Sequence, residues 1–360
     1  MHINDLLKIA VERKASDLHL KVGAFPVIRV DGTLLPLADM RRLMQEDTIA
    51  MAFSIMSARQ KEKFKNNFEI DIAYNVPNLG RFRCNIFQQR GTVGLVLRVI
   101  PAKILTIKEL LLPPVLEKIC LEQRGLVLCT GTTGSGKSTT LAAMIDHINA
   151  TRNEHVMTIE DPIEFLHRDK KSIVNQREVD VDTKGFSLAL RSALRQDPDV
   201  ILVGEMRDYE TIETALTAAE TGHLVFSTLH TIDASKTVER IIGTFDAGDQ
   251  QAVRTRLAGS FRNFIAQRLI PKKGGGRIAV LEILRSTLRT REYIERGESQ
   301  GKSLLDAMKD GALDGMQYFD GEIERLVREG VLSYRTGLLY ATNSDNLRLQ
   351  LADLPSEQMD

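Results

Sequence analysis

The segment GTTGSGKS at residues 131–138 constrains the fold more than any other feature of this 360-residue chain. It follows an apolar run, GLVLCT, and leads into TTLAAMIDHI, a good helix former. Glycines let such a loop adopt positive φ angles and bring backbone N–H groups against an anion. The following helix directs the positive end of its dipole at the same anion. The pattern therefore predicts a strand, a phosphate-binding loop and a helix in direct succession.

The residue types of this loop predict bound ATP and Mg²⁺ as cofactors. Lys137 is expected to reach the β- and γ-phosphates, and the Ser138 hydroxyl to ligate Mg²⁺. The other expected ATP-binding residues are Thr133, Gly134, Ser135, Gly136 and Thr139.

From Gly125 onward, apolar runs alternate with helical patterns, which favours an α/β domain with a parallel central sheet. Continuous apolar runs are typical of strands buried on both faces. The expected strands are GLVLCTG, HVMTIED, DVILVGE, HLVFSTLH and RIAVLEIL. After about residue 240 the pattern is mostly helical, in AVRTRLAGSFRNFIAQRLI, SLLDAMKDG and FDGEIERLVREG.

The first hundred residues predict a small α+β domain, with helical patterns at the start and over about 45–65. Asp31-Gly32 between two alternating runs indicates a hairpin. The expected strands are DLHLKV, PVIRV, TLLPL, EIDIAYNV, RFRCNIFQQR and TVGLVLRVI. We therefore expect a small domain at 1–100, a linker with a short apolar helix at 101–114, a P-loop domain at 115–285 and a helical region at 286–360.

Acidic residues end two of the expected parallel strands. Ligands bind at the carboxyl ends of such strands, and hydrolysis needs one carboxylate for the metal's water shell and another to orient the attacking water. The candidates are Glu160, Asp161, Glu164 and Glu205. His230 ends a third strand at the same edge, where it could sense the γ-phosphate.

Composition excludes several functional classes. The chain has 48 Lys+Arg and 48 Asp+Glu, whereas a nucleic-acid binder normally carries a basic excess, and its 5% aromatic content without Trp disfavours a DNA translocase. No apolar run reaches the roughly 18–20 residues that span a bilayer, and the start lacks the apolar core of a signal peptide. Cys84, Cys120 and Cys129 fit neither a disulfide framework nor a zinc site, so we expect reduced thiols in a cytoplasmic protein without membrane insertion.

Four longer segments resemble the secretion ATPases of the type II secretion and type IV pilus superfamily: GTTGSGKSTT, TIEDPIEF, LRQDPDVILVGEMRD and ETGHLVFSTLHT. ASDLHL, IRVDG, GRFRCNIF and LPPVL extend the resemblance across nearly the whole chain, which is most similar to the pilus retraction motors. The resemblance implies a RecA-like P-loop domain preceded by a small PAS-like domain. It also implies that Glu164 is the general base, that Glu205 holds Mg²⁺ through water, and that His223 and His230 are the two histidines of the His box.

The resemblance further implies that the small domain supplies arginines to the nucleotide of a neighbouring subunit. By their FR-x-N and VLRV contexts, Arg83 and Arg98 match those positions. RFRCNIFQQRG is a basic strand in a chain without net charge, so its positive face needs a partner, although a solvated edge strand is the alternative interpretation. Arginines acting between subunits require a closed ring. The expected assembly is a homo-hexamer at the cytoplasmic side of the inner membrane, bound to the pilus platform protein and, as a further candidate partner, a paralogous motor. It would power pilus retraction and twitching motility.

Other functions stay open at this point. LRTREYIERGE keeps little of the AIRNLIREGK stretch of retraction motors, so an accessory retraction subunit with weak hydrolysis is one alternative. A pilus-extension or type II secretion ATPase is another, but such motors carry an extra N-terminal region and commonly a four-cysteine metal site, neither of which this sequence shows. Thr132 replaces the usual proline of the loop, which we expect to leave phosphate binding intact.

Overall fold

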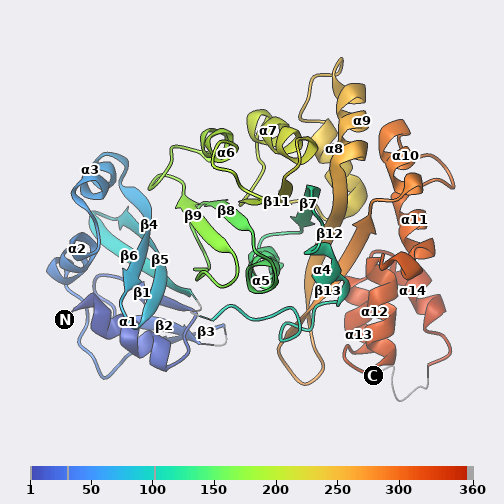
Figure 1. Cartoon of the computed structure of the whole chain (residues 1–360). Helices are drawn as coiled ribbons and strands as arrows, with labels where there is room; N and C mark the ends of the chain where they lie inside the picture. Colours follow the sequence, from blue (N-terminus) through green and yellow to red (C-terminus); the bar gives the residue numbers. More distant parts are fainter. Residues whose placement is uncertain (1, 31, 101–102, 355–360) are drawn as a thin grey trace. The chain divides into compact units, whose positions relative to one another are not determined.

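The computed structural model describes residues 2–30, 32–100 and 103–354, and the chain forms two compact units (Figure 1). The first comprises Met1–Lys103 and the short segment Pro162–Leu166, and the second comprises Ile104–Asp161 and His167–Asp360. The sequence placed the short segment in the P-loop domain, but its contacts belong to the first unit. The expected domain boundaries stay predictions.

The first unit contains a six-stranded antiparallel sheet of order β3-β2-β1-β6-β5-β4. Its strands are β1 (Asp17–Leu20), β2 (Val27–Val30), β3 (Thr33–Pro36), β4 (Glu69–Val76), β5 (Gly80–Gln89) and β6 (Thr92–Ile100). All six were predicted. Val30 pairs with Thr33, which confirms the hairpin; Asp31 itself lies outside the described residues.

Among its described residues, this unit also contains three helices: α1 (Ile3–Glu12), α2 (Gln45–Ser54) and α3 (Ala58–Asn67). The single helical stretch expected over 45–65 is wrong, because Ser57 begins a new helix. Its side chain accepts from the Gln60 N–H at 3.3 Å, and its own N–H donates to Gln60 Oε1 at 2.8 Å, which is a capping box. The unit's core includes Leu6 of α1, Phe64 of α3 and Phe82 of β5.

The second unit is built on a seven-stranded sheet of order β13-β12-β7-β11-β10-β8-β9. All neighbouring pairs are parallel except β12 with β13. The strands are β7 (Gly125–Thr130), β8 (His155–Glu160), β9 (Ile173–Glu178), β10 (Val200–Val203), β11 (Leu224–Leu229), β12 (Phe261–Pro271) and β13 (Arg277–Arg285). Every residue of β7, β10 and β11 is buried, so the predicted parallel sheet with doubly covered strands is confirmed.

Helices cover both faces of this sheet. One face packs against α4 (Val115–Ile119) and α5 (Lys137–Thr151). The other packs against α6 (Phe186–Ala193), α7 (Tyr209–Glu220), α8 (Ala234–Ile242), α9 (Gln250–Ser260), α10 (Leu288–Arg296) and α11 (Leu304–Asp310). After the 3₁₀ turn η1 (Ala312–Asp314), a separate cluster joins β12 and β13 to α12 (Phe319–Arg328), α13 (Tyr334–Tyr340) and α14 (Ser344–Gln350).

Three further details of the predicted secondary structure are wrong. AVRTRLAGSFRNFIAQRLI is not one helix: α9 ends at Ser260, and β12 then pairs in parallel with β7. β9 was not predicted, because its IVNQRE sequence is polar and half exposed at the sheet edge. The short helix expected within 101–114 is absent from the described part of that segment, which forms turns before α4.

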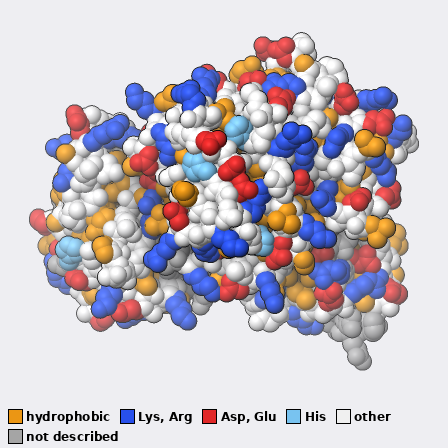
Figure 2. Space-filling view, in the orientation of Figure 1, with side chains coloured by type: hydrophobic (Ala, Val, Ile, Leu, Met, Phe, Trp, Pro, Cys, Tyr) orange, Lys and Arg blue, Asp and Glu red, His pale blue; other side chains and the backbone are white. Residues whose placement is uncertain are grey.

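The surface carries both signs of charge, as the equal numbers of acidic and basic residues predict, and the cysteines form no disulfide among the described residues. Lys/Arg and Asp/Glu side chains are mixed over the visible face (Figure 2). Cys84, Cys120 and Cys129 are free and buried, and burial raises the pKa of each thiol to about 12. Within the residues the structure describes, no helix is long and apolar enough to cross a membrane.

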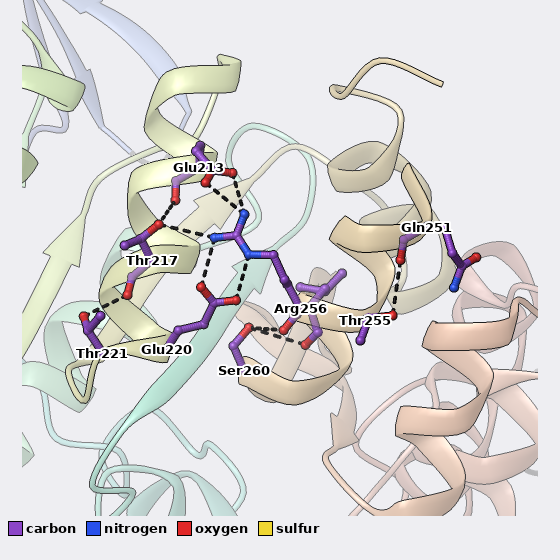
Figure 3. Close-up of polar contacts among 9 residues, drawn as sticks. Glu213, Thr217, Glu220, Thr221, Gln251, Thr255, Arg256 and Ser260 are labelled. Atoms are coloured by element: carbon purple, nitrogen blue, oxygen red, sulfur yellow. Dashed lines mark hydrogen bonds and ion pairs between the residues drawn. The ribbon is translucent and has the colours of Figure 1, made fainter. Parts of the chain in front are cut away.

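Arg256 ties α9 to α7 on one face of the second sheet (Figure 3). Its five N–H groups make five hydrogen bonds: two to Glu213 and two to Glu220, each at 2.9 Å, and one to the Thr217 hydroxyl at 3.3 Å. The three charged side chains are each about a third exposed. Charge-assisted bonds of this kind are the stronger ones in proteins. Because α9 leads directly into β12, the cluster fixes where that strand begins.

We expect Arg256→Met to lower the free energy of unfolding of the second unit by about 2–3 kcal/mol, because Glu213 and Glu220 would lose their shared donor. Urea denaturation followed by circular dichroism measures the change. Arg191→Met is the matched control, since it removes only the exposed Arg191–Glu210 pair and should cost less than about 1 kcal/mol. Equal losses in the two variants would contradict the role assigned to Arg256.

Candidate active site

The loop at residues 131–136 connects β7 to α5 and has the geometry of a phosphate cradle. Gly131, Gly134 and Gly136 have φ angles of 144°, 80° and 91°, which L side chains rarely adopt. Gly136 is the N-cap of the 15-residue α5, so the helix directs its unpaired N–H groups at the loop. Ser135 Oγ is buried and has no hydrogen-bond partner among the described residues, as a donor reserved for an anion would be. These features fit a nucleotide phosphate.

Lys137 lies beneath this loop. It is 8% exposed, and its Nζ donates to the carbonyl oxygens of Gly131 at 2.8 Å and Thr132 at 3.1 Å. The ammonium group is therefore held next to the cradle by the loop itself. Thr133, Gly134 and Ser138 are exposed on the loop and at the start of α5, and Thr139 is half-buried.

Gln267 of β12 supports the loop from below and was not predicted as a site residue. It is 2% exposed, its Nε2 donates to the Ser135 carbonyl at 2.8 Å, and its Oε1 accepts from the Thr140 hydroxyl at 2.8 Å. A Cβ atom at Gly131 would collide with the Gln267 carbonyl, and one at Gly136 would lie 2.8 Å from Nε2. The sequence pattern predicts a helix over this segment, and a helix there gives no reason to place Gln267 next to the loop.

Register brings Glu205 and His230 to the edge of the sheet where the loop lies. Thr130, the last residue of β7, pairs with Leu229, and Val203, the last residue of β10, pairs with Ser227. Because these strands are parallel, the residues that follow them emerge at one edge. Glu205 is two residues beyond β10 and His230 is one beyond β11, as the sequence predicted.

The Glu205 carboxylate contacts two cationic or ionisable groups. Its Oε2 lies 2.7 Å from an Arg207 nitrogen, and its Oε1 lies 3.3 Å from His230 Nε2. Burial opposes ionisation of Glu205, but the hydrogen bond and charge of Arg207, with a smaller effect of His230, hold its pKa below the usual range. Sequence reasoning missed Arg207, although it stands in the VGEMRD segment two residues after the acid.

The remaining acids lie at the end of β8. Glu160 Oε1 accepts from the Thr158 hydroxyl at 2.7 Å and from Gln176 Nε2 at 3.0 Å, so it is held by its neighbours. Asp161 is exposed. Glu164 lies in Pro162–Leu166, which belongs to the first unit.

His223 lies at the other end of β11 from His230. It directly precedes that strand, and its Nδ1 is 3.0 Å from the Ala218 carbonyl at the end of α7. The structure therefore does not bring the two histidines together within this unit.

Arg83 and Arg98 stand directly opposite each other on β5 and β6 of the first unit. Arg98 Nε donates to Asp17 Oδ1 at 3.0 Å, and Arg83 Nε lies 3.9 Å from Asp71. Asp17 also pairs in register with Arg29, so one row across the sheet carries three arginines and one buried aspartate. The side chains of Arg98 and Arg83 are 65% and 39% exposed. The row therefore carries a net positive charge.

Among residues 2–30, 32–100 and 103–354, no group of three or more His, Cys, Asp or Glu side chains gathers as a metal site. Mg²⁺ keeps several waters and takes one or two protein ligands beside nucleotide phosphates. Ser138 and the partly buried, ionised Glu205 fit such a site.

Comparison with known proteins decides the family. Residues 1–276 match the family described as type II/IV secretion system protein. The chain is 49% identical to the type IV pilus retraction ATPase PilT of Pseudomonas aeruginosa, over 92% of this chain and 96% of that protein. It is 40% identical to the type IV pilus ATPase PilU of the same organism, over 98% of this chain and 91% of that protein. A crystal structure of the pilus retraction motor PilT with bound ADP covers 97% of this chain and 99% of its own with a TM-score of 0.90 and 45% identity.

The chain belongs to the type IV pilus retraction ATPases. The resemblance inferred from the motifs is therefore confirmed, as are the fold class and the assignment to retraction rather than extension. Membership of this family establishes ATPase activity and nucleotide binding. The roles of the individual residues stay predictions.

We expect Gln267→Leu to weaken ADP binding about tenfold, because the Ser135 carbonyl and Thr140 hydroxyl would lose their buried partner and the loop its support. Isothermal titration calorimetry measures the affinity. Gln317→Leu is the control, since Gln317 likewise donates to a backbone carbonyl, that of Leu281 at 2.8 Å, outside the loop. If the two variants bind ADP equally well, Gln267 does not shape the loop.

Proposed function

We propose that this pilus retraction ATPase is Mg²⁺-dependent and works as a homo-hexameric ring at the cytoplasmic face of the inner membrane, where it acts on the pilus platform protein. The observation that carries the proposed site is the convergence of the P-loop with Glu205 and His230 at one edge of the second sheet. The ring and the platform contact rest on the family and on the arginine row of the first unit.

The chain's residues divide the work of hydrolysis as follows. Backbone N–H groups of the loop and of the start of α5 bind the phosphates, and Lys137 exchanges its own loop carbonyls for phosphate oxygens. Ser138 and Glu205 would hold Mg²⁺, which neutralises charge on the phosphates when bound. Glu164, four residues after the end of β8, orients the attacking water and accepts its proton. His230, which contacts Glu205 through Nε2, senses the γ-phosphate.

Arg83 and Arg98 act on the nucleotide of a neighbouring subunit. Two like charges directly opposite on a sheet oppose each other, and of the two nearby carboxylates, that of Asp17 is shared with a third arginine, Arg29. An anion placed over this pair relieves the repulsion. In the transition state of phosphoryl transfer, that anion is the developing charge on the phosphate.

We expect Mg-ATP hydrolysis by the purified chain, and a loss of about a hundredfold or more in Lys137→Ala and in Glu164→Gln. Phosphate release measures the rate, and EDTA should abolish it. Lys236→Ala, which removes an exposed Lys236–Glu239 pair, should keep wild-type activity. Hydrolysis that survives Lys137→Ala or EDTA would contradict the proposed site, and well-folded protein that binds but does not hydrolyse ATP would indicate an accessory subunit.

Mixing two inactive variants tests whether the arginines act between subunits. The double variant Arg83→Ala/Arg98→Ala keeps its P-loop, and Lys137→Ala keeps its arginines, so mixed rings contain some complete sites. We expect each protein alone to lose about a thousandfold in rate and the mixture to recover a measurable fraction. Lys137→Ala mixed with Glu205→Gln is the control, because both changes lie in one unit and should not complement. Mixed rings that form, as native mass spectrometry would show, but stay inactive would contradict action in trans.

A further inference from the structure

Both oxygens of the Glu205 carboxylate are engaged by side chains of this chain. Arg207 holds Oε2 at 2.7 Å, and His230 Nε2 lies 3.3 Å from Oε1. The Glu205 side chain is 16% exposed, whereas that of Arg207 is 69% exposed. The Glu205 carboxylate is therefore largely buried, whereas the Arg207 side chain is mostly exposed to solvent and has room to change rotamer.

The backbone around the pair is held on both sides. The Gly204 N–H donates to the Ile159 carbonyl of β8 at 2.8 Å, and the Thr228 hydroxyl of β11 donates to the Gly204 carbonyl at 2.7 Å. The Met206 N–H donates to the Thr228 carbonyl at 3.2 Å. Glu205 and Arg207 can therefore separate by side-chain rotation while the backbone of Gly204 and Met206 keeps these hydrogen bonds.

A second carboxylate lies near enough for its charge to act on Arg207. The hydrogen bond and charge of Glu205 raise the pKa of the Arg207 guanidinium, and the charge of Asp161, just beyond β8, adds a smaller effect in the same direction. Asp161 is exposed and follows Glu160 directly.

We infer that Arg207 is a positioning residue: its ion pair with Glu205 competes with Mg²⁺ for that carboxylate and so lowers the affinity of the site for the metal. The inference rests on the proposed function of the site. A cation on a metal ligand competes with the metal, so the apparent affinity for Mg²⁺ is the intrinsic affinity multiplied by the fraction of molecules in which the ligand is free. A merely structural pair on the surface would contribute slightly to stability and leave metal affinity unchanged.

The test is a Mg²⁺ titration of the full chain with a fluorescent ADP analogue, which reports binding without hydrolysis. We expect Arg207→Ala to lower the Mg²⁺ concentration at half-saturation roughly two- to sixfold, the range that follows from the strength of exposed ion pairs. Arg207→Lys, which keeps a cation next to Glu205, should shift the midpoint less. Arg191→Ala is the matched control, because it breaks an exposed Arg–Glu pair of the same unit and should leave the midpoint unchanged.

Repeating the titration in the Glu205→Gln background distinguishes an effect of Arg207 through Glu205 from a general effect of removing a positive charge. If Arg207 acts through Glu205, Arg207→Ala no longer shifts the midpoint when Glu205 is Gln. A shift that persists there, or no shift in the original background, overturns the inference while Mg-dependent binding of ADP stays intact. Failure of the unmodified chain to bind the ADP analogue would instead contradict the proposed function, and the inference with it.

Discussion

The contact between the P-loop and Gln267 of β12 is the constraint on which the second unit depends. Gly131 and Gly136 have no room for a side chain because β12 passes so close, and the pairing of β12 with β7 holds it there. The next residue, Arg268, points to the other face, where its guanidinium stacks 3.8 Å from the ring centroid of Phe319 in α12. One strand therefore supports the phosphate loop on one face and the C-terminal helices on the other. The shape of the loop and the packing of those helices are parts of a single arrangement.

The sequence predicted the elements whose patterns are local. Continuous apolar runs identified β7, β10 and β11, and the loop was recognised from its own residues. β12 was missed for a physical reason: Phe261, Phe264 and Ile265 follow a helical spacing, and a strand buried on both faces has no alternation to distinguish it from a buried helix. Only its pairing with β7 decides the matter, and that pairing joins residues more than 130 positions apart. The division of the helix near Ser57 was missed although the capping box there is local.

The candidate site was predictable in its residue types but not in its partners. Glu205 and His230 could be placed at one edge of the sheet from strand order alone, whereas the guanidinium that holds Glu205 depends on side-chain rotation. In the first unit, the alignment of Arg98 with Arg83 and Asp17 follows from the register of three strands, which no single segment specifies. The partner of a charged side chain depends on strand register and on side-chain rotation in the folded chain. Sequence patterns therefore predict these partners less well than they predict the residues of the site.

The charged groups proposed to act on ATP are paired with the chain's own atoms. Lys137 donates to two carbonyls of its loop, Glu205 is held by Arg207, and Arg98 donates to Asp17. These pairs satisfy groups that would be costly to leave unpaired near the protein interior. Under the proposed function, the nucleotide exchanges these partners on binding, so its net affinity is a difference between two sets of charge-assisted bonds. A motor needs such balance, because a site that bound ATP with the full strength of every pair would release its products too slowly to turn over.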